Sequence, residues 1–374
     1  MLSPQQIESF AAYLFDVYGE IEIGLIANVA AMFRLESLPE LTGMEKWYFD
    51  ILAEAGALRT KNTKLLARYA KRTDAEIANM LQNAGYKSVE YDERLYERAF
   101  KLGAPLTRPE AVNMSPRLSQ IIGAAARNMR GEFNMVNTVA LESASEAFIK
   151  IANAVMLEAS TGISTLQTAT SRAVQRMAKE GITAVRYRSS DGRMINYHVD
   201  TAVRRMVLTT TGQMAGNIQM ERAREWGSNL VEVSSHAAAR PAHAVWQGRV
   251  YSVEGSTPKY PNLVEVTGFG SVTGLKGANC AHEIYPFVEG ISERRFAPTQ
   301  NAAQNEKQYN NTQELRKLER EKRELKRREA AAAAAKDEEQ LKRIGKKLDD
   351  KNGEIRQLVK AKDLTRRRSR ESIA

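Results

Sequence analysis

Three of the four histidines and the single cysteine of this chain lie between residues 236 and 282, in two short clusters. The first cluster holds His236 and His243, and the second holds Cys280 and His282. Imidazole nitrogens and a thiolate are ligands that zinc prefers, and a structural zinc site takes four of them in a tetrahedron. One interpretation is therefore a single structural zinc ion bound by these four side chains, although the spacings within each pair are unusual for zinc.

A second interpretation of the same residues is a polar network that locks the two loops together without a metal. Arg240 and Asn279 would satisfy backbone carbonyls, and Trp246, Tyr251 and Phe287 would pack around them. The residues of this predicted network are His236, Arg240, His243, Trp246, Asn279, Cys280 and His282. Both interpretations require the two clusters to lie side by side, and both describe a scaffold rather than a reaction centre.

Catalysis is a third interpretation. Two histidines with an asparagine and a cysteine would suit a metal-dependent nuclease or a Cys-His nucleophile. Such a nuclease would usually need a further acid or histidine on a following helix, and only Glu283 and Glu289 are near. The residues after Cys280 are also too few for the long helix that usually begins at a nucleophilic cysteine. We therefore predict no catalytic residue and no enzymatic activity.

The elements that must position these clusters are expected to form a small α+β domain over residues 181–296. Alternating side chains on both sides of Asp191 and Gly192 predict a β-hairpin. The expected elements, in order, are that hairpin, a helix capped by Asp200 and running to about Trp226, and strands over 229–234, 250–253 and 263–266. The histidine and cysteine clusters would then lie on loops between strands.

Residues 1–180 are predicted to be helical throughout, because apolar residues recur at steps of three and four. Thr73 and Glu76 have the spacing of a capping box, which predicts that a helix begins there and ends at Gly85. Two short helices in this arrangement resemble a helix-turn-helix, although helix pairs are common in all-helical domains. We expect this region to pack as a helical bundle or against a partner protein.

The C-terminal part is predicted to be a linker over residues 297–313 and a basic amphipathic helical tail over 314–374. From Ala303 onwards the chain has 22 Lys and Arg residues against 14 Asp and Glu, which gives the tail most of the net charge of +10. The tail could contact DNA, or it could be a solvated helix of mixed charge. The candidate DNA contacts are Arg366, Arg367, Arg368 and Arg370, in a stretch expected to be frayed. The apolar stripe is thin, so we expect the tail to need a partner or a second chain, and self-association through it is one possibility.

Composition narrows the classes of protein to which the chain can belong. The 374 residues include 43% hydrophobic and 27% charged side chains, and no stretch is long and apolar enough for a membrane span. The N-terminus lacks the pattern of a signal peptide, and a single cysteine cannot form an internal disulfide. The predicted fold class is therefore α+β, with a mostly helical N-terminal region, a small α+β domain and a charged helical tail.

Residues 180–290 resemble the phage minor capsid protein 2 family, which is related to the phage Mu F-like head-morphogenesis minor head proteins. The matching segments run from Tyr187 to Arg193, from Tyr197 to Met206, over Ser235-His236, from Arg240 to Gly248, and from Gly274 to His282 with Tyr285-Pro286-Phe287. Broader relatives have two cysteine pairs that look like a zinc site. Here Arg240 and His243 occupy the first pair and His282 replaces the last cysteine, so His236 would have to supply the missing ligand.

The resemblance implies a structural protein of the virion, made in the host cytoplasm and placed inside the capsid near the portal in few copies. Its expected partners are the portal and the major capsid protein, with packaged DNA on the tail. It would act in head assembly or in DNA packaging and ejection. The alternative is a metal-dependent nuclease or other effector that is packaged in the virion and delivered with the DNA.

Overall fold

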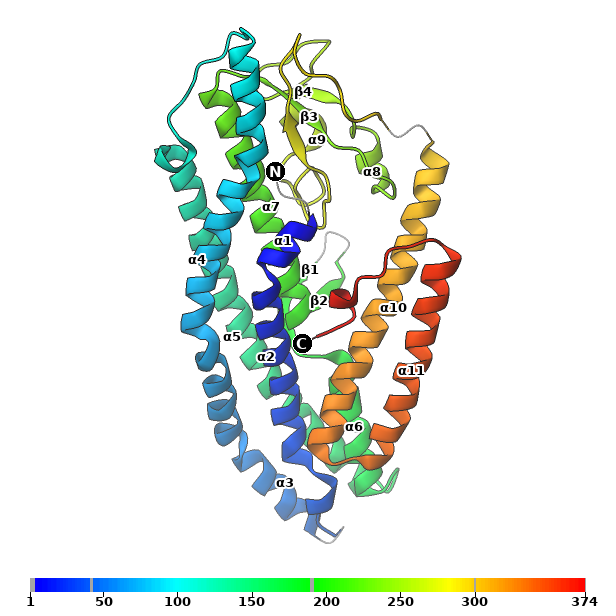
Figure 1. Ribbon diagram of the computed structural model, residues 1–374. Coiled ribbons are helices and arrows are strands. Elements are labelled where there is room, and N and C mark those ends of the chain that lie inside the picture. The colour runs from blue at the N-terminus through cyan, green and yellow to red at the C-terminus, as the bar shows by residue number, and fades with distance from the viewer. Residues whose placement is uncertain (1–3, 41–42, 189–191, 299–300, 374) are drawn as a thin grey trace. The chain divides into compact units, whose positions relative to one another are not determined.

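The computed structural model describes residues 4–40, 43–188, 192–298 and 301–373, and Figure 1 shows the arrangement of its helices and strands. The helices are α1 (Pro4–Phe10), α2 (Ala12–Ala30), α3 (Met44–Ala53), α4 (Ala55–Lys101), α5 (Pro116–Ser160), α6 (Leu166–Glu180), α7 (Val199–Glu225), α8 (Pro241–Ala244), α9 (Leu263–Thr267), α10 (Ala302–Ala335) and α11 (Glu338–Ala361). The strands are β1 (Thr183–Arg188), β2 (Met194–His198), β3 (Leu230–Val233), β4 (Val250–Ser252) and β5 (Ile284–Pro286). This mostly helical chain with two small antiparallel sheets confirms the predicted α+β class. No described helix combines the length and apolar character that crossing a membrane requires.

Contacts group the chain into two compact units, each built from three separated stretches. Unit 1 comprises residues 1–13, 74–131 and 204–313, and unit 2 comprises residues 14–73, 132–203 and 314–374. The limits fall inside helices, because α2, α4, α5, α7 and α10 each contribute residues to both units. The sequence instead predicted consecutive segments, since periodicity along the chain carries no information about which distant helices pack together.

Unit 1 contains the three-stranded sheet, in the order β4-β3-β5, with both neighbours antiparallel to β3. The predicted strands at 229–234 and 250–253 are thereby confirmed. Buried apolar side chains from the sheet and the loops around it form one core cluster: Met220, Val231, Val233, Trp246, Tyr251, Val253, Leu263, Leu275 and Ile284. This core holds the loops that follow β3 and precede β5.

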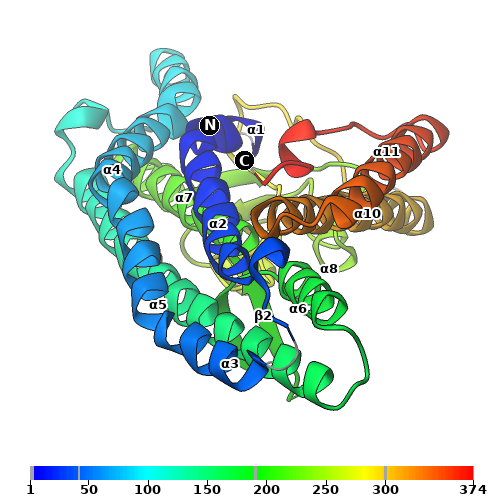
Figure 2. The ribbon, with the colours of Figure 1, turned by 90° about the horizontal axis from the view of Figure 1, so that it is seen from below.

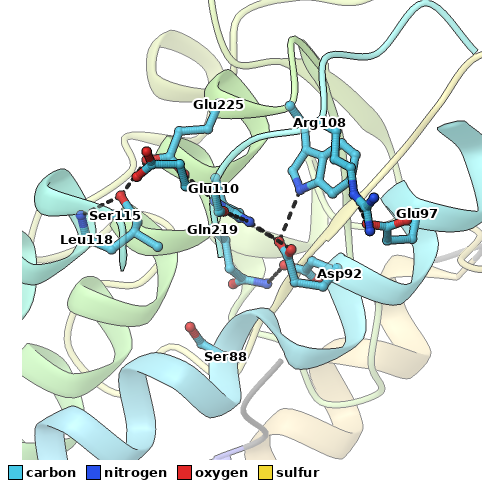
Figure 3. Close-up of polar contacts among 12 residues, drawn as sticks. Ser88, Asp92, Glu97, Arg108, Glu110, Ser115, Leu118, Gln219 and Glu225 are labelled. Atoms are coloured by element: carbon cyan, nitrogen blue, oxygen red, sulfur yellow. Dashed lines mark hydrogen bonds and ion pairs between the residues drawn. The ribbon is translucent and has the colours of Figure 1, made fainter. Parts of the chain in front are cut away.

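Helices α4 and α7 are joined in unit 1 by a buried polar network (Figure 3). The Arg222 guanidinium, almost fully buried on α7, donates to the carboxylates of Glu93 and Glu225 and to the backbone oxygen of Glu110. Gln219, one turn earlier, donates to Asp92 and also to the backbone oxygen of Ile284 in β5. Because Arg222 has three acceptors, its charge is compensated although it is buried. The network thus fixes α7 against both α4 and the sheet.

Unit 2 contains the two-stranded sheet, in which β1 pairs with β2 in antiparallel register from Thr183 opposite His198 to Arg188 opposite Met194. The predicted hairpin is confirmed, while part of its turn, residues 189–191, lies outside the described residues. Aromatic side chains join the helices of this unit. Tyr18 packs on Phe133 with ring centroids 4.8 Å apart, and Phe33 packs on Phe148 at 5.4 Å.

Helices α10 and α11 run side by side in both views, as Figures 1 and 2 show. Leu325, Ala332 and Ile344 form the buried seam between them, with Leu341 and Leu348 packed against it. The predicted amphipathic helical tail thus consists of two helices, α10 and α11, that bury their apolar side chains against each other. The sequence predicted that the apolar stripe of the tail needs a partner or a second chain. In the structure the stripe is buried within the chain, because the two helices pack on each other and on the rest of unit 2.

Two pairs of charged residues attach α10 within unit 2. Arg323 lies 2.8 Å from Asp200, and Arg327 lies 3.5 Å from Glu22. Asp200 stands in the first turn of α7, which begins at Val199, so it pairs with α10 and is not the cap that the sequence predicted. The tail is therefore held on α7 by the ion pair of Arg323 with Asp200, and on α2 by the contact of Arg327 with Glu22. The sequence could not reveal either contact.

Four local predictions were wrong. The helix-turn-helix does not exist, because α4 runs unbroken past Thr73, whose hydroxyl donates to the Tyr69 carbonyl inside the helix instead of capping. Residues 263–266 form helix α9 and not a strand, because Asn262 caps it at one end and Gly268 ends it in a left-handed conformation. The predictions of a linker over residues 297–313 and of a frayed C-terminal stretch were also wrong. Helix α10 starts at Ala302 with Asn301 accepting from the Gln304 N–H, and residues 366–373 are folded back.

Candidate functional site

The site lies in unit 1, where two loops meet beside the sheet. The first loop leaves β3 at Ser234 and contains α8, which begins with Pro241 at its first position, where the missing N–H costs nothing. The second loop runs from Ser271 to β5. Ser234 and Glu283 join the loop ends, since the Ser234 N–H donates to the Glu283 carbonyl and the Glu283 N–H donates to the Ser234 hydroxyl.

The second loop is tightly wound. A Cβ at Gly277 would lie 2.1 Å from the Ser271 carbonyl oxygen, a distance that no side chain can adopt. Glycine is therefore needed here for the close approach of two backbone segments. This winding brings Cys280 and His282 back toward the first loop.

Three of the four predicted zinc ligands converge. The sulfur of Cys280 lies 3.8 Å from Nδ1 of His243 and 3.6 Å from Nδ1 of His282, and the three ligand atoms all lie within 4.8 Å of one another. Both histidines are buried, with 2% and 1% of their surfaces exposed, and Cys280 is half-buried. The convergence joins residues that are up to 39 positions apart in the sequence.

The other ring nitrogen of each histidine faces an oxygen. Nε2 of His243 lies 2.7 Å from the backbone oxygen of Thr273, and Nε2 of His282 lies 2.8 Å from the side-chain oxygen of Gln247. A carbonyl oxygen can only accept, so each Nε2 carries the proton and each Nδ1 has a lone pair. The two lone pairs point to the same sulfur.

His236 lies beside this group and not within it. Its ring packs on that of His282 with centroids 4.3 Å apart, and its Nδ1 lies 2.9 Å from the Ala237 carbonyl oxygen. Its Nε2 is buried and has no hydrogen-bond partner among the described residues. The predicted fourth ligand is therefore adjacent, with an unused lone pair.

The remaining predicted network residues differ in their contacts. Arg240 donates to the Ala278 carbonyl at 2.9 Å, so it links the two loops as proposed. Trp246 packs on His243 and His282 at 4.6 and 4.8 Å between centroids, and its carbonyl accepts from the Tyr251 hydroxyl. The Asn279 side chain is exposed, and this residue contributes a left-handed turn with a φ of 57°.

Burial favours the uncharged forms of His243, Cys280 and His282. Desolvation lowers the pKa of His243, although its bond to Thr273 opposes this, and desolvation with the neighbouring histidines lowers the pKa of His282 to about 2. Desolvation also raises the pKa of the Cys280 thiol. A nucleophilic cysteine needs a thiolate at neutral pH, so these surroundings work against that chemistry in the metal-free chain.

Sequence reasoning assigned no structural role to four contributors. Gln247 accepts from both His282 and the backbone N–H of His236, and the amide of Asn305 on α10 pairs with the N–H and carbonyl of Ala239. A buried ion pair of Lys276 and Glu283 closes the second loop at 2.6 Å. Gln247 stood inside the quoted motif, while Asn305 lay in a stretch interpreted as a linker and gave no signal.

The predicted DNA-contacting arginines do not form a free basic end. Arg366 is paired with Glu371 at 2.6 Å, and the Arg370 carbonyl accepts from Arg323. Arg368 is exposed, and Arg367 is partly buried. Four other basic residues are exposed on one face of α11: Lys342, Arg343, Lys346 and Lys347.

Comparison with known proteins gives one family and two relatives. The family described as phage minor capsid protein 2 matches residues 2–360. A structural protein of Lactococcus phage LL-H is 26% identical over 351 residues, which cover 88% of this chain and 89% of that protein. A structural protein of Lactococcus phage mv4 is 34% identical over 120 residues, which cover 31% of this chain and 94% of that protein. No solved structure matches the chain.

Proposed function

The chain belongs to the phage minor capsid protein 2 family, and on this premise we propose that it is a low-copy structural component of the phage head, next to the portal, that acts in head assembly or DNA packaging and ejection. The match over residues 2–360 is the observation that carries the proposal. The two relatives support the structural part, since both are structural proteins of phages. The position at the portal and the stage of action are the finer parts of the proposal.

The site supports a scaffold rather than a reaction centre. His243 and His282 are buried, each has one nitrogen held by an oxygen acceptor, and the thiol between them is kept neutral by burial. Such groups fix two loops against each other. A fixed loop surface is what a protein needs to bind a partner of fixed geometry such as a portal or a capsid shell.

Contact with packaged DNA is the second part of the proposal, and it concerns α11. Lys342 and Lys346 are one turn apart, as are Arg343 and Lys347, so the four exposed cations form one face of the helix. These four exposed cations are better placed to contact phosphates than Arg366, whose charge Glu371 already neutralises. The tail's apolar stripe is buried between α10 and α11, so self-association through it is not part of the proposal.

Quantitative mass spectrometry of purified particles tests the main proposal. We expect the chain in every particle, at a small fraction of the abundance of the major capsid protein. A nonsense mutation in the gene should yield few DNA-filled heads, and expression of the intact chain in trans should restore them. Absence of the chain from purified particles, or an abundance equal to that of the major capsid protein, would contradict the proposal.

DNA retention by the purified chain tests the second part. Replacement of the four α11 cations by glutamine should lower the slope of log affinity against log salt by roughly 0.9 per lost phosphate contact. Replacement of the exposed Arg368 is the matched control and should change little. An unchanged slope in the α11 variant would refute DNA contact through this face.

The rival function is a nuclease or effector delivered with the DNA. Incubation of the purified chain with DNA and divalent metals separates the two. Metal-dependent cleavage that disappears in the His243→Ala variant would favour the rival over the scaffold.

A further inference from the structure

The side chains around Cys280 have more nitrogen lone pairs than protons to share with them. Nδ1 of His243 and Nδ1 of His282 both have lone pairs directed at Cys280, whose thiol has a single proton. That proton can satisfy only one of the two nitrogens at a time. The other lone pair is left buried without a donor, which is unfavourable by the usual cost of an unsatisfied polar group.

His236 adds a third unused lone pair. Its Nδ1 faces the Ala237 carbonyl and so carries the proton, which leaves Nε2 as an acceptor that is buried and unpartnered within the described chain. Three nitrogen lone pairs and one thiol therefore lie together with one proton among them. A cation that accepts from all four atoms would satisfy every one of them.

We propose that His243, Cys280 and His282 bind one zinc ion, with Nε2 of His236 as the fourth donor. The two sulfur–nitrogen distances fit this ion: zinc–sulfur bonds of about 2.3 Å and zinc–nitrogen bonds of about 2.0–2.1 Å at tetrahedral angles place sulfur and nitrogen roughly 3.6 Å apart. The structure has 3.6 and 3.8 Å. The ring of His236 must turn out of its stack on His282 to complete the tetrahedron.

The surroundings have the features of a metal site. Ligating histidines usually donate their second N–H to a carbonyl or carboxylate, which fixes the ring and makes the ligating nitrogen more basic. Thr273 and Gln247 have this role for His243 and His282. Mixed nitrogen and sulfur donors in a tetrahedron select zinc over the hard cations magnesium and calcium.

Binding of the ion proceeds without redox change. Zinc forms bonds to three neutral imidazoles and to the Cys280 sulfur, and the thiol releases its proton to solvent. Four protein donors leave no open position for substrate, so the site is structural and joins the two loops covalently through the ion.

The test uses the full-length chain, purified without a histidine tag. After dialysis, elemental analysis should find about one zinc ion per chain, and His198→Gln, which changes the only histidine outside the cluster, should keep it. Cobalt-loaded chain should show the charge-transfer absorption of a cobalt–thiolate bond, and Cys280→Ser should abolish it. A folded chain that retains no zinc, or that retains it equally in His243→Ala and Cys280→Ser, would overturn the proposal.

A second variant covers the case in which ligand replacements unfold the loops. Gln247→Leu removes the acceptor of His282 but no ligand, and it should weaken zinc affinity roughly 10–100-fold in a chelator competition. Gln247→Glu keeps an acceptor and should retain the affinity. Equal zinc affinity in the leucine and glutamate variants would also contradict the proposal.

Discussion

Replacing Glu22 by glutamine should stabilise the protein, and should do so more as the pH rises. Glu22 is fully buried on α2, where its carboxylate accepts from the Asp200 N–H at 2.9 Å and faces Arg327 at 3.5 Å. Burial, followed by the nearby charge of Asp200, raises the pKa of Glu22 from 4.5 to about 8, and Arg327 offsets this only in part. Glu22 is therefore protonated in the folded chain at neutral pH.

The magnitude follows from linkage between protonation and folding. A folded-state pKa above the unfolded value gives stability that is fully present below pH 4.5 and is lost progressively up to pH 8. The loss is about 1.4 kcal/mol per pH unit, hence roughly 3 kcal/mol at pH 7. Glutamine has the same shape and a neutral side chain at every pH, so it avoids this loss. The free energy of unfolding of Glu22→Gln minus that of the native chain should be near zero at pH 4.5 and should rise with pH.

Urea unfolding at several pH values from 4.5 to 8, with hydrogen exchange of α2 peptides as a local measure, checks this prediction. Asp16→Asn, an exposed change on the same helix, is the matched control and should show no trend with pH. A variant that is less stable than the native chain at pH 7 would refute the reasoning. It would mean that Glu22 is ionised and that its pair with Arg327 stabilises the fold.

Three further predictions concern other parts of the chain. Gly248→Ala should destabilise unit 1 by more than about 1 kcal/mol in urea unfolding, because φ is 69° and the new Cβ would lie 2.3 Å from the Ala297 carbonyl oxygen. The control is Gly255→Ala, where φ is 67° but no atom lies near the new Cβ. Hydrogen bonds from Arg366 and Lys322 outweigh burial and lower the pKa of Glu371 to about 2. This carboxylate therefore stabilises the fold above pH 4.5, and its contribution is lost as the pH falls toward 2. Hydrogen exchange of residues 366–373 should become faster in that pH range, and protection that persists at pH 2 would contradict the prediction. Zinc held at 100 times its dissociation constant should stabilise the folded chain by about 2.7 kcal/mol over chelator-treated chain in thermal unfolding, and equal midpoints would count against the site.

Local patterns allowed much of the fold to be predicted. The hairpin, β3 and β4 follow from alternating side chains, and α7 follows from an unbroken helical period. The apolar seam of α10 and α11 was visible because Leu318 and Leu325 are seven residues apart, as are Leu341 and Leu348. Each of these features depends on residues that are close in the sequence.

Features that depend on distant contacts could not be predicted. The pairs of Glu22 and Asp200 with α10 join residues that are more than 100 positions apart, so nothing in the tail itself shows where it docks. Asn262 and Gly268 made a short helix of residues whose side chains favour strands, because capping at both ends outweighed propensity.

The candidate site lies between these two cases. Residue type and grouping identified His243, Cys280 and His282, since histidine and cysteine are rare in this chain. Sequence could not assign the protonated nitrogen of each ring, and therefore it could not identify Gln247 as a partner. That assignment required the distances to the oxygen acceptors.

Cryo-electron microscopy of intact phage particles, reconstructed around the portal vertex without imposed capsid symmetry, tests the proposed role most directly. The account predicts density into which units 1 and 2 fit, inside the head and in contact with the portal. Density for the chain on the outer capsid surface or in the tail, with none at the portal, would contradict it.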